Sequence, residues 1–420
     1  MKPKQPGHPD VDLALSPEDM QWWRDAKFGL FLHWGVYAIP GRGEWVMFTE
    51  RMDVEEYRKL ADHFRPKQFD ARAWAKAAKD AGMRYMVLTA RHHDGFCLFD
   101  SKASEFTSVK TAARRDFVAE YCEACGEAGL RVGLYYSPMD WRFPGYFFPD
   151  LYRESALAMK EQCWAQVREL MSNYGRIDIL WWDGAWLAHG GIGFDKSRGG
   201  WYSRNDADAG GSWLWESEGL NAMVRELQPK IVINPRSGWR GDFETREGFT
   251  GEMQTDRPWE QCDTLTGTWG HIPGRPMRSL RSCVQLLASV VCRDGNLLLN
   301  VGPTAEGAIE PRQVRRLAEV GEWLSKYGEV IYGTRAGPFR PGPWGGSTHR
   351  GNMVYLHILD WPEDTLTLPA CERRIVASRS LTGQAVNIEQ IEEAIRVSVP
   401  PQDREAMDTI IALELDGLPA

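Results

Sequence analysis

Residues 69–91, FDARAWAKAAKDAGMRYMVLTAR, predict one helix followed directly by one buried strand. Asp70 is a candidate N-cap, because its carboxylate can accept hydrogen bonds from the first backbone N–H groups of a helix. Apolar residues recur at the helical period from Trp74 to Ala81, and Gly82 is placed to end the helix. The run RYMVLTAR that follows is nearly continuously apolar, as in a strand covered on both faces. This stretch therefore predicts one α/β unit of a parallel sheet.

The same alternation of helix and strand continues along most of the chain. Five further apolar runs have the texture of buried strands: AKFGLFLHW, RVGLYYS, IDILWWD, KIVINPR and GNLLLNV. Residues 240–290 leave room for two irregular strands, so we expect a (β/α)8 TIM-like barrel. A doubly wound sheet is the alternative, although no glycine-rich phosphate-binding motif follows the first strand.

The texture of the sequence changes after Gly333. Residues 337–347, GPFRPGPWGGS, are typical of a linker, and NMVYLHILDW, TLTLP and TIIALELDG then alternate like short antiparallel strands. We therefore expect residues 1–334 to form the α/β barrel and residues 335–420 to form a small C-terminal antiparallel β-sandwich domain.

Charge and hydropathy argue against several kinds of partner. The formal net charge is −8 and the basic residues are scattered, so no nucleic acid partner is expected. No stretch approaches the roughly 20 apolar residues of a membrane span. The first residues, MKPKQPGHPDVDLALSP, also lack the apolar core of a secretory signal. We therefore expect a cytoplasmic protein without membrane contact.

Cysteine and tryptophan usage give weaker indications. The eight cysteines are spread through the chain, which favours reduced thiols over a disulfide framework. Cys122 and Cys125 form a C-x-x-C pair, but no second pair or histidine follows at zinc-site spacing, so packing on one helix face is favoured. The 19 tryptophans offer flat faces on which sugar rings stack, although tryptophan is also a large core residue.

Polar side chains follow five of the predicted strands at the point where each strand ends. In order along the chain they are His33, the run Arg91, His92, His93 and Asp94, the run Tyr135, Tyr136 and Ser137, then Asp183, and finally Asn234 and Arg236. Chemistry in an α/β barrel takes place at the carboxyl ends of the strands, where these residues meet. The sequence therefore predicts a pocket lined by polar groups.

The run IDILWWDGAW at residues 177–186 places an acid at the end of a very apolar strand. A buried carboxylate is costly unless it is paired, so Asp183 needs a partner. Side chains alternate along a strand, so Trp181 shares a face with Asp183. Two roles stay open: a nucleophile kept ionised by Arg236 or a histidine, and a cap for the helix that follows.

His92 and His93 raise the question of a metal. Two ligands on one face of a strand need H-x-H spacing, whereas adjacent residues diverge. Neutral histidines that donate hydrogen bonds fit this spacing better. A metal-dependent barrel hydrolase stays as an alternative, and chelators would inhibit it. We expect no metal and no organic cofactor.

Seven segments in this order resemble the family 29 glycoside hydrolases, the α-L-fucosidases. They are WWRDAKFGLFLHWGVYAIPGRGEW, FDARAWAKAAKDAGMRYMVLTARHHDGFCLFDS, VGLYYSPMDW, IDILWWDG, IVINPR, WEQCDTLTGTWGH and GNLLLNVGPTAEGAIE. The resemblance implies an irregular barrel followed by a β domain. It also implies a retaining exo-enzyme that releases terminal α-L-fucose from glycans or oligosaccharides through a covalent glycosyl–enzyme intermediate, without a cofactor.

The resemblance also implies roles for individual residues. The aspartate of the W-x-D-G run, here Asp183, is the family's nucleophile. Strand parity favours Tyr135 over Tyr136 as the tyrosine of the Y-Y-S strand. The sugar-binding residues implied by the motifs are His33, Glu44, His92, His93, Tyr135, Trp181 and Arg236.

The general acid/base is harder to assign. Many family members carry a loop similar to G-D-[FY]-x-T-P-E, and here GDFETRE puts Glu247 at the place of the glutamate. Arg246 stands where that loop has proline, so the loop conformation is open. Glu260 in PWEQC is the alternative acid/base, and Glu252 is a further competitor.

Several properties stay open at this stage. A non-catalytic fucose-binding protein on the same scaffold and a glycosidase acting on α-L-galactosides are alternative functions. Linkage, aglycone and oligomeric state are not predicted. Residues 191–211, GIGFDKSRGGWYSRNDADAGG, form a polar, glycine-rich insertion that is either an ordered lid or a mobile flap.

Overall fold

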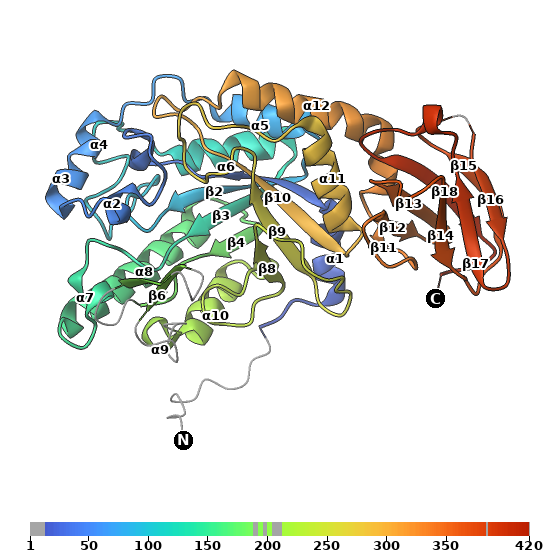
Figure 1. Ribbon diagram of the computed structural model, residues 1–420. Coiled ribbons are helices and arrows are strands. Elements are labelled where there is room, and N and C mark those ends of the chain that lie inside the picture. The colour runs from blue at the N-terminus through green and yellow to red at the C-terminus, as the bar shows by residue number, and fades with distance from the viewer. Residues whose placement is uncertain (1–12, 188–191, 196–199, 204–211, 384, 420) are drawn as a thin grey trace.

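The computed structural model describes residues 13–187, 192–195, 200–203, 212–383 and 385–419 (Figure 1). Its main body is built on one sheet of eight parallel strands, in the order β7-β4-β3-β2-β1-β10-β9-β8. The strands are β1 (Phe28–Leu32), β2 (Tyr85–Arg91), β3 (Arg131–Tyr136), β4 (Ile179–Trp182), β7 (Val232–Ile233), β8 (Glu244–Glu247), β9 (Trp259–Thr264) and β10 (Gly295–Val301). The TIM-like barrel is thus confirmed. The two strands expected between residues 240 and 290 are β8 and β9, and they pair with each other in a continuous register, so they are not irregular.

Asp242 joins the two ends of this sheet, where the described strands β7 and β8 share no ladder. Its backbone N–H donates to the Ile233 carbonyl at 2.7 Å, and its carboxylate accepts the Ile233 N–H at 2.8 Å. Arg225 donates to both carboxylate oxygens, at 3.2 and 3.0 Å, and so neutralises this buried acid. A side chain therefore does at this seam what a backbone ladder does elsewhere in the barrel.

Seven helices of eight or more residues are described around the sheet. They are α1 (Pro17–Ala26), α5 (Ala71–Asp80), α6 (Phe117–Ala128), α8 (Arg153–Asn173), α10 (Ser217–Leu227), α11 (Leu280–Val291) and α12 (Pro311–Tyr327). The expected N-cap is confirmed, because Asp70 accepts the backbone N–H groups of Arg72 and Ala73 at 2.9 and 3.1 Å. Gly129 ends α6 in the left-handed conformation that glycine favours.

Helix α1 packs into the amino end of the barrel. Its Met20 and Trp23 belong to the same buried cluster as inward-facing strand residues such as Phe31 and Ile179. The Trp23 ring lies 4.5 Å from that of Phe243. This end of the barrel is therefore filled with apolar side chains, which leaves the carboxyl ends of the strands for a site.

Short elements gather beyond the carboxyl ends of the strands, at the left of Figure 1. They are η1 (Val36–Ala38), α2 (Val46–Thr49), α3 (Val54–Arg58), α4 (Leu60–His63), α7 (Pro144–Phe147) and α9 (Ser212–Trp215). From the insertion at 191–211, β5 (Ile192–Asp195) and β6 (Gly200–Ser203) form a two-stranded antiparallel sheet, and its other residues lie outside the described ranges. Whether this insertion is a lid or a flap stays a prediction.

The C-terminal part consists of two antiparallel sheets that share one apolar core. One sheet has the order β11-β12-β13-β18-β15 and the other β14-β17-β16. The elements are η4 (Gly328–Val330), β11 (Arg335–Ala336), β12 (Gly345–Arg350), β13 (Met353–Ile358), β14 (Thr365–Pro369), β15 (Ile375–Ser380), β16 (Asn387–Gln390), β17 (Ala394–Ser398), η5 (Pro401–Asp403) and β18 (Thr409–Leu415). Residues from β13, β14, β17 and β18 make up that core, which confirms the expected β-sandwich.

The predicted domain boundary after residue 334 coincides with the start of β11. The two parts are in contact, since the Thr348 hydroxyl donates to the Val330 carbonyl at 2.9 Å and the Gln285 amide to the Leu359 carbonyl at 3.0 Å. The division into two domains stays a prediction. No helix within the described ranges is long and apolar enough to cross a membrane.

Candidate active site

One cavity opens at the carboxyl ends of the strands. Among the residues that line it are all of the predicted site residues except the alternative acid/base: His33, Glu44, His92, His93, Tyr135, Trp181, Asp183, Arg236 and Glu247. These residues come from six different strand ends and one loop, so the fold brings together groups that lie far apart in the sequence. Their positions fit the predicted pocket, and their individual roles stay predictions.

Asp183 lies directly after β4, and residues 184–187 are irregular, so it does not cap a following helix. Arg236 donates to its Oδ1 at 3.0 Å and the Tyr135 hydroxyl donates to its Oδ2 at 3.0 Å. The His93 Nε2 lies 3.6 Å from the same Oδ2. Burial alone would raise the pKa of Asp183, but Arg236, His93 and Tyr135 outweigh burial and hold it below its ordinary value. Asp183 is therefore an ionised carboxylate that faces the cavity.

Arg236 binds two carboxylates with one guanidinium group. Its Nη1 donates to Asp183, and its Nη2 donates to Glu247 Oε2 at 2.7 Å. Both nitrogens are attached to the same carbon, so Asp183 and Glu247 contact neighbouring N–H groups of one guanidinium. The guanidinium also lies over the Trp181 ring, 4.9 Å from its centroid. The two candidate catalytic carboxylates are thus neighbours across Arg236.

Glu247 ends strand β8, and its side chain is 44% exposed, so solvent and a bound molecule can both reach it. Arg246 next to it occupies the position where similar loops have proline. Its guanidinium stacks on the Trp259 ring at 3.9 Å and donates to the carbonyls of Thr250 at 2.6 Å and Glu252 at 2.9 Å. Arg246 therefore holds the loop after β8 by hydrogen bonds and stacking.

Glu260 lies deeper in the barrel and does not line the cavity. Its Oε1 accepts the Trp181 indole N–H at 3.0 Å, and its Oε2 accepts the Tyr85 hydroxyl at 2.6 Å. Burial raises the pKa of Glu260 to about 7, although both hydrogen bonds oppose this. Gly29 makes this arrangement possible, because a Cβ there would lie 2.4 Å from the Tyr85 ring. The geometry makes Glu260 a support for the Trp181 ring.

The substitution Glu260→Gln is expected to flatten the pH dependence of stability. The pKa of Glu260 rises from the ordinary value of 4.5 to about 7 on folding. The contribution of Glu260 to the free energy of unfolding is therefore fully present below pH 4.5. It is lost as the pH rises through about 7. Glutamine accepts from Trp181 and donates to Tyr85 without ionising. The variant should therefore keep the roughly 1–3 kcal/mol of unfolding free energy that the wild-type protein loses as Glu260 ionises.

Urea unfolding at a series of pH values measures this effect. The matched control is Glu252→Gln, in an exposed loop, which should leave the pH dependence as in the wild-type protein. If the free energy of unfolding depended on pH in the same way in Glu260→Gln and in the wild-type protein, the raised pKa of Glu260 would be wrong.

The three histidines of the cavity are neutral. Burial, the largest cause in each case, lowers the pKa of His33 to about 3 and that of His93 to about 4, and it lowers the pKa of His92 well below its ordinary value. The Asn300 amide oxygen accepts a hydrogen bond from His33 Nδ1 at 2.7 Å, which leaves His33 Nε2 for the cavity. The His92 ring stacks on Tyr135 with centroids 5.5 Å apart. These lowered pKa values agree with the expectation of neutral hydrogen-bonding histidines, whose role stays a prediction.

Glu44 is a buried carboxylate at the rim of the cavity. Its Oε2 accepts the Gly270 backbone N–H at 2.8 Å. Burial raises the pKa of Glu44, and the backbone hydrogen bond opposes that shift. Glu44 is thus held in place by the backbone at Gly270.

Five further residues line the cavity and were not predicted from the sequence: Phe31, Trp45, Trp186, Cys262 and Trp269. The strand period predicts the inward orientation of Phe31 and Cys262, because they share faces with His33 and Glu260. The three tryptophans stand in irregular segments, which carry no period. Trp45 and Trp186 lie beside His93, with centroids 5.4 and 6.0 Å away, and Trp269 lies 5.1 Å from His33. Together they form aromatic walls.

Metal ligation has no support within the described residues, since no three His, Cys, Asp or Glu side chains there are grouped to hold an ion.

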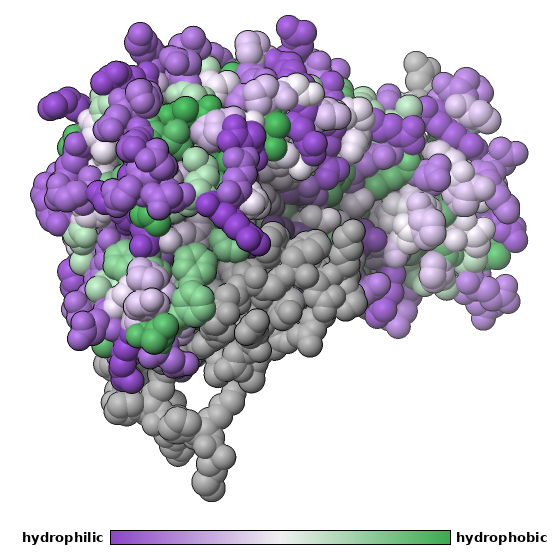
Figure 2. All heavy atoms as spheres, turned by 60° about the vertical axis from the view of Figure 1, so that its left-hand side comes forward, coloured by the Kyte–Doolittle hydropathy of each residue, from purple (hydrophilic) through white to green (hydrophobic). Residues whose placement is uncertain are grey.

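Figure 2 brings the left-hand side of Figure 1 forward and shows a mostly hydrophilic face with an apolar patch at its lower left. The large exposed apolar side chains near α7 and the start of α8 are Phe148, Leu151, Tyr152 and Leu157.

A parallel α/β barrel whose carboxyl-end cavity combines two neighbouring carboxylates, neutral histidines and aromatic walls defines a class of protein, the glycoside hydrolases. The family model of the α-L-fucosidases matches residues 5–329, and the chain belongs to this family. It is accordingly a glycoside hydrolase that releases fucose.

Individual relatives agree with this assignment. The chain is 30% identical over 394 residues to the tissue α-L-fucosidase of Bos taurus, which covers 85% of this chain and 78% of that protein. The structure of α-L-fucosidase isoenzyme 1 from Paenibacillus thiaminolyticus superposes with a TM-score of 0.81 at 35% identity, covering 95% of this chain and 99% of that one. A family 29 α-L-fucosidase from Bacteroides thetaiotaomicron, trapped as a covalent intermediate with 2-fluoro-fucosyl fluoride, gives 0.83 at 27% identity over 96% and 97% of the two chains.

Proposed function

We propose that this α-L-fucosidase hydrolyses terminal α-L-fucose by double displacement, with Asp183 as the nucleophile and Glu247 as the general acid/base. The observation that carries the proposal is the shared guanidinium of Arg236, which binds one oxygen of each carboxylate. Retaining glycosidases need two carboxyl groups about 5 Å apart, one on each side of the reacting bond. The covalent intermediate trapped in the Bacteroides relative supports the same route here.

The two steps balance as follows. In the first, an Asp183 oxygen bonds to C1 of fucose while the glycosidic oxygen takes a proton from Glu247 and leaves with the aglycone. In the second, Glu247 takes a proton from water, the water oxygen bonds to C1, and the ester bond to Asp183 breaks. Fucose is released, and both carboxyl groups return to their starting states. The reaction requires no metal or cofactor.

Arg236 has a second consequence for this scheme. The acid must reach the glycosidic oxygen in the first step, whereas Glu247 Oε2 is bound to Arg236 here. We therefore propose that the entering sugar separates Glu247 from Arg236, which leaves Glu247 beside the negative charge of Asp183. A neighbouring negative charge favours the protonated form, as the acid role requires.

The remaining cavity residues bind the sugar in this proposal. His33, His92, His93 and Glu44 offer donors and acceptors for its hydroxyl groups. Trp181, Trp269 and Phe31 supply apolar surface, which suits the C6 methyl group of fucose. The substrate is a fucosylated glycan or oligosaccharide. We further propose a cytoplasmic location, which fractionation of the source cells would test.

The stereochemistry of the first product tests the mechanism. Two displacements at C1 each invert the configuration, so α-L-fucose should form first from an aryl α-L-fucoside. Proton NMR spectra recorded at high enzyme concentration, before mutarotation, distinguish the anomers. If β-L-fucose is the first product, the reaction is a single displacement and Asp183 forms no covalent intermediate.

A further inference from the structure

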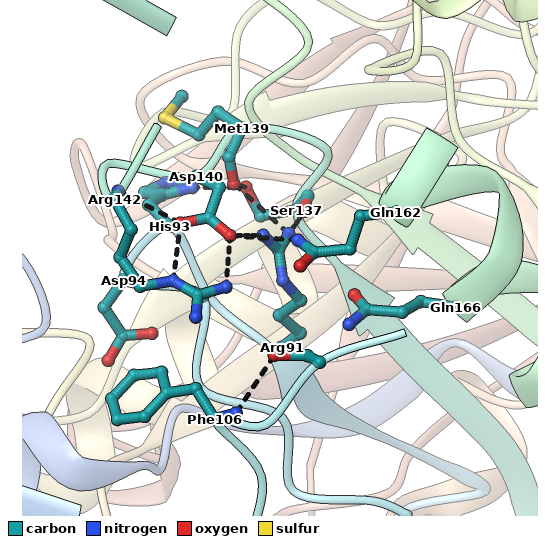
Figure 3. Close-up of polar contacts among 12 residues, drawn as sticks. Arg91, His93, Asp94, Phe106, Ser137, Met139, Asp140, Arg142, Gln162 and Gln166 are labelled. Carbon is teal, nitrogen blue, oxygen red and sulfur yellow. Dashed lines mark hydrogen bonds and ion pairs between the residues drawn. The ribbon is translucent and has the colours of Figure 1, made fainter. Parts of the chain in front are cut away.

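A buried polar cluster lies beside His93, and Figure 3 shows it. It contacts the Nδ1 of His93, whereas the Nε2 of the same ring faces Asp183. The His93 Nδ1 lies 2.6 Å from the Ser137 hydroxyl oxygen. The same hydroxyl is also placed to donate to the Met139 carbonyl, at 3.3 Å. Ser137 follows β3 and is fully buried, and the mechanism proposed above does not use it.

Arg91 fixes the segment that carries this hydroxyl. Its Nη1 donates to the carbonyls of Ser137 and Met139, and its Nη2 donates to Asp140. Arg142 donates to both oxygens of Asp140, at 2.9 and 2.6 Å. The side chains of Arg91 and Asp140 are completely buried, so the segment after β3 is anchored by ion pairs that water does not screen.

The Ser137 proton has two directions open to it. A hydroxyl has one proton and two acceptors within reach here, the Met139 carbonyl and His93 Nδ1. The Met139 carbonyl already accepts from Arg91 at 3.2 Å, whereas His93 Nδ1 has its short contact with Ser137. The Met139 carbonyl has two lone pairs and could accept from Ser137 as well, but the contact of the hydroxyl with Nδ1 is much the shorter, 2.6 Å against 3.3 Å, which favours donation to Nδ1.

The opposite arrangement has an electrostatic cost. If His93 carried its proton on Nδ1, the lone pair of Nε2 would face the Asp183 carboxylate oxygen 3.6 Å away. With the proton on Nε2, an N–H group faces that carboxylate instead. Two electron-rich atoms repel each other in this buried site, whereas a donor stabilises the carboxylate.

We propose that Ser137 is a positioning residue that donates a hydrogen bond to His93 Nδ1 and so holds His93 as the Nε2–H tautomer, which directs an N–H donor at Asp183. The proposal deepens the proposed function, because it rests on Asp183 as the nucleophile. Second hydrogen bonds that set the tautomer of a functional histidine are a general device in proteins. Here the Arg91–Asp140–Arg142 cluster fixes the serine, and the serine fixes the histidine.

The surroundings of His93 keep its imidazole neutral, so the ring has one proton, on either Nδ1 or Nε2. Burial lowers the pKa of His93 to about 4, Asp183 opposes this, and Arg91 and Arg236 add to it. The charged and titratable groups around the His93–Asp183 pair are His92, Arg91, Arg236, Tyr135, Glu247, Glu44 and His33. Above pH 4 the imidazole therefore has a single proton, and Ser137 determines its place.

Nitrogen NMR spectra of the wild-type enzyme test the proposal directly. The chain has nine histidines, and labelling them with 15N followed by a long-range 1H–15N correlation separates the two tautomers. The His93→Asn variant identifies the His93 signals by difference. We expect Nε2 to be protonated and Nδ1 to be unprotonated at neutral pH. A protonated Nδ1 would overturn the proposal without any serine variant.

The variant Ser137→Ala should move both the tautomer and the pH profile. Without the hydroxyl, the Nδ1–H form becomes populated, and kcat/KM for an aryl α-L-fucoside should fall about tenfold. Loss of the donor raises the pKa of Asp183, so the acidic limb of the profile should shift to higher pH by about half a unit. Ser137→Cys keeps the shape of the side chain but donates only weakly. Its kcat/KM and its acidic limb should therefore lie between those of the wild-type enzyme and those of Ser137→Ala.

The matched control is Ser347→Ala. Ser347 is also a buried serine, and its hydroxyl bonds the Phe339 backbone N–H and carbonyl at 3.0 and 2.9 Å, within the C-terminal sandwich. It should lose comparable stability and leave the His93 signals and the pH profile unchanged. An unchanged His93 spectrum and acidic limb in folded Ser137→Ala would overturn the inference.

The inference and the proposed function can fail separately. If Asp183→Asn keeps its turnover while Ser137→Ala still changes the His93 tautomer, the nucleophile assignment is wrong and the role of Ser137 in fixing His93 holds. If Asp183→Asn is inactive while Ser137→Ala changes neither readout, the proposed function holds and the role of Ser137 is wrong.

Discussion

The substitution Asp183→Asn is expected to lower kcat for an aryl α-L-fucoside by roughly 10⁴-fold or more. Removal of a nucleophile normally costs several powers of ten, because an amide oxygen does not form the covalent bond to C1. The fold should persist, since the asparagine oxygen still accepts from Arg236 and its size is unchanged. Steady-state hydrolysis and a thermal unfolding curve measure the two parts of this prediction.

Asp178→Asn is the matched control for this experiment. Asp178 stands just before the same strand, β4, but at the amino end of the barrel, where it pairs with Arg131 and Arg176 at 2.9 and 2.8 Å. Its replacement should lower stability and leave turnover near the wild-type level. A variant Asp183→Asn that keeps more than about a tenth of wild-type turnover would remove Asp183 from the mechanism.

Glu247→Ala is expected to lower turnover by about 10²–10⁴-fold, and azide should restore much of it for an activated aryl fucoside. A good leaving group departs without a proton, so the covalent intermediate forms and then waits for a base. Azide needs no base and attacks from the side of water, so the product should be α-L-fucosyl azide. Product NMR spectra identify the anomer.

The azide experiment also separates the roles of the two carboxylates. In Asp183→Ala, azide would take the place of the nucleophile and give β-L-fucosyl azide instead. Glu252→Ala is the matched loop control and should behave as wild type without rescue. If azide rescues Glu260→Ala and not Glu247→Ala, the acid/base is the deeper glutamate.

The register of β8 and β9 shows why strand periodicity alone could not rank the two candidate acids, which only the resemblance of the loop to a family motif ranked. Glu260 pairs with Thr245, whereas Glu247 pairs with Cys262, two residues further along β9. Two residues along a strand correspond to about 6.6 Å, roughly one layer of side chains inside a barrel. Glu247 therefore reaches the cavity, and Glu260 lies one layer below it, against Trp181. Both positions have the same parity, so the strand period cannot distinguish them.

Other features of the site follow directly from local patterns. Alternation along β4 predicts that Trp181 and Asp183 face the barrel interior and Trp182 the surrounding helices, and the structure has Trp181 and Trp182 in separate buried clusters. The cap at Asp70 and the helix end at Gly129 also depend only on neighbouring residues. Such features are predictable because a hydrogen bond or a period within a few residues decides them.

The sequence by itself determined the six regular strands, the helices between them, and the set of polar residues that meet at the strand ends, because periodicity and burial are local properties of a chain. Only the tertiary structure decided that Arg236 joins Asp183 to Glu247, that Glu260 supports Trp181, and that Ser137 faces His93. Those contacts depend on strand register and on loop paths between residues far apart in the chain. No local pattern encodes such distances, since packing of the whole barrel sets them.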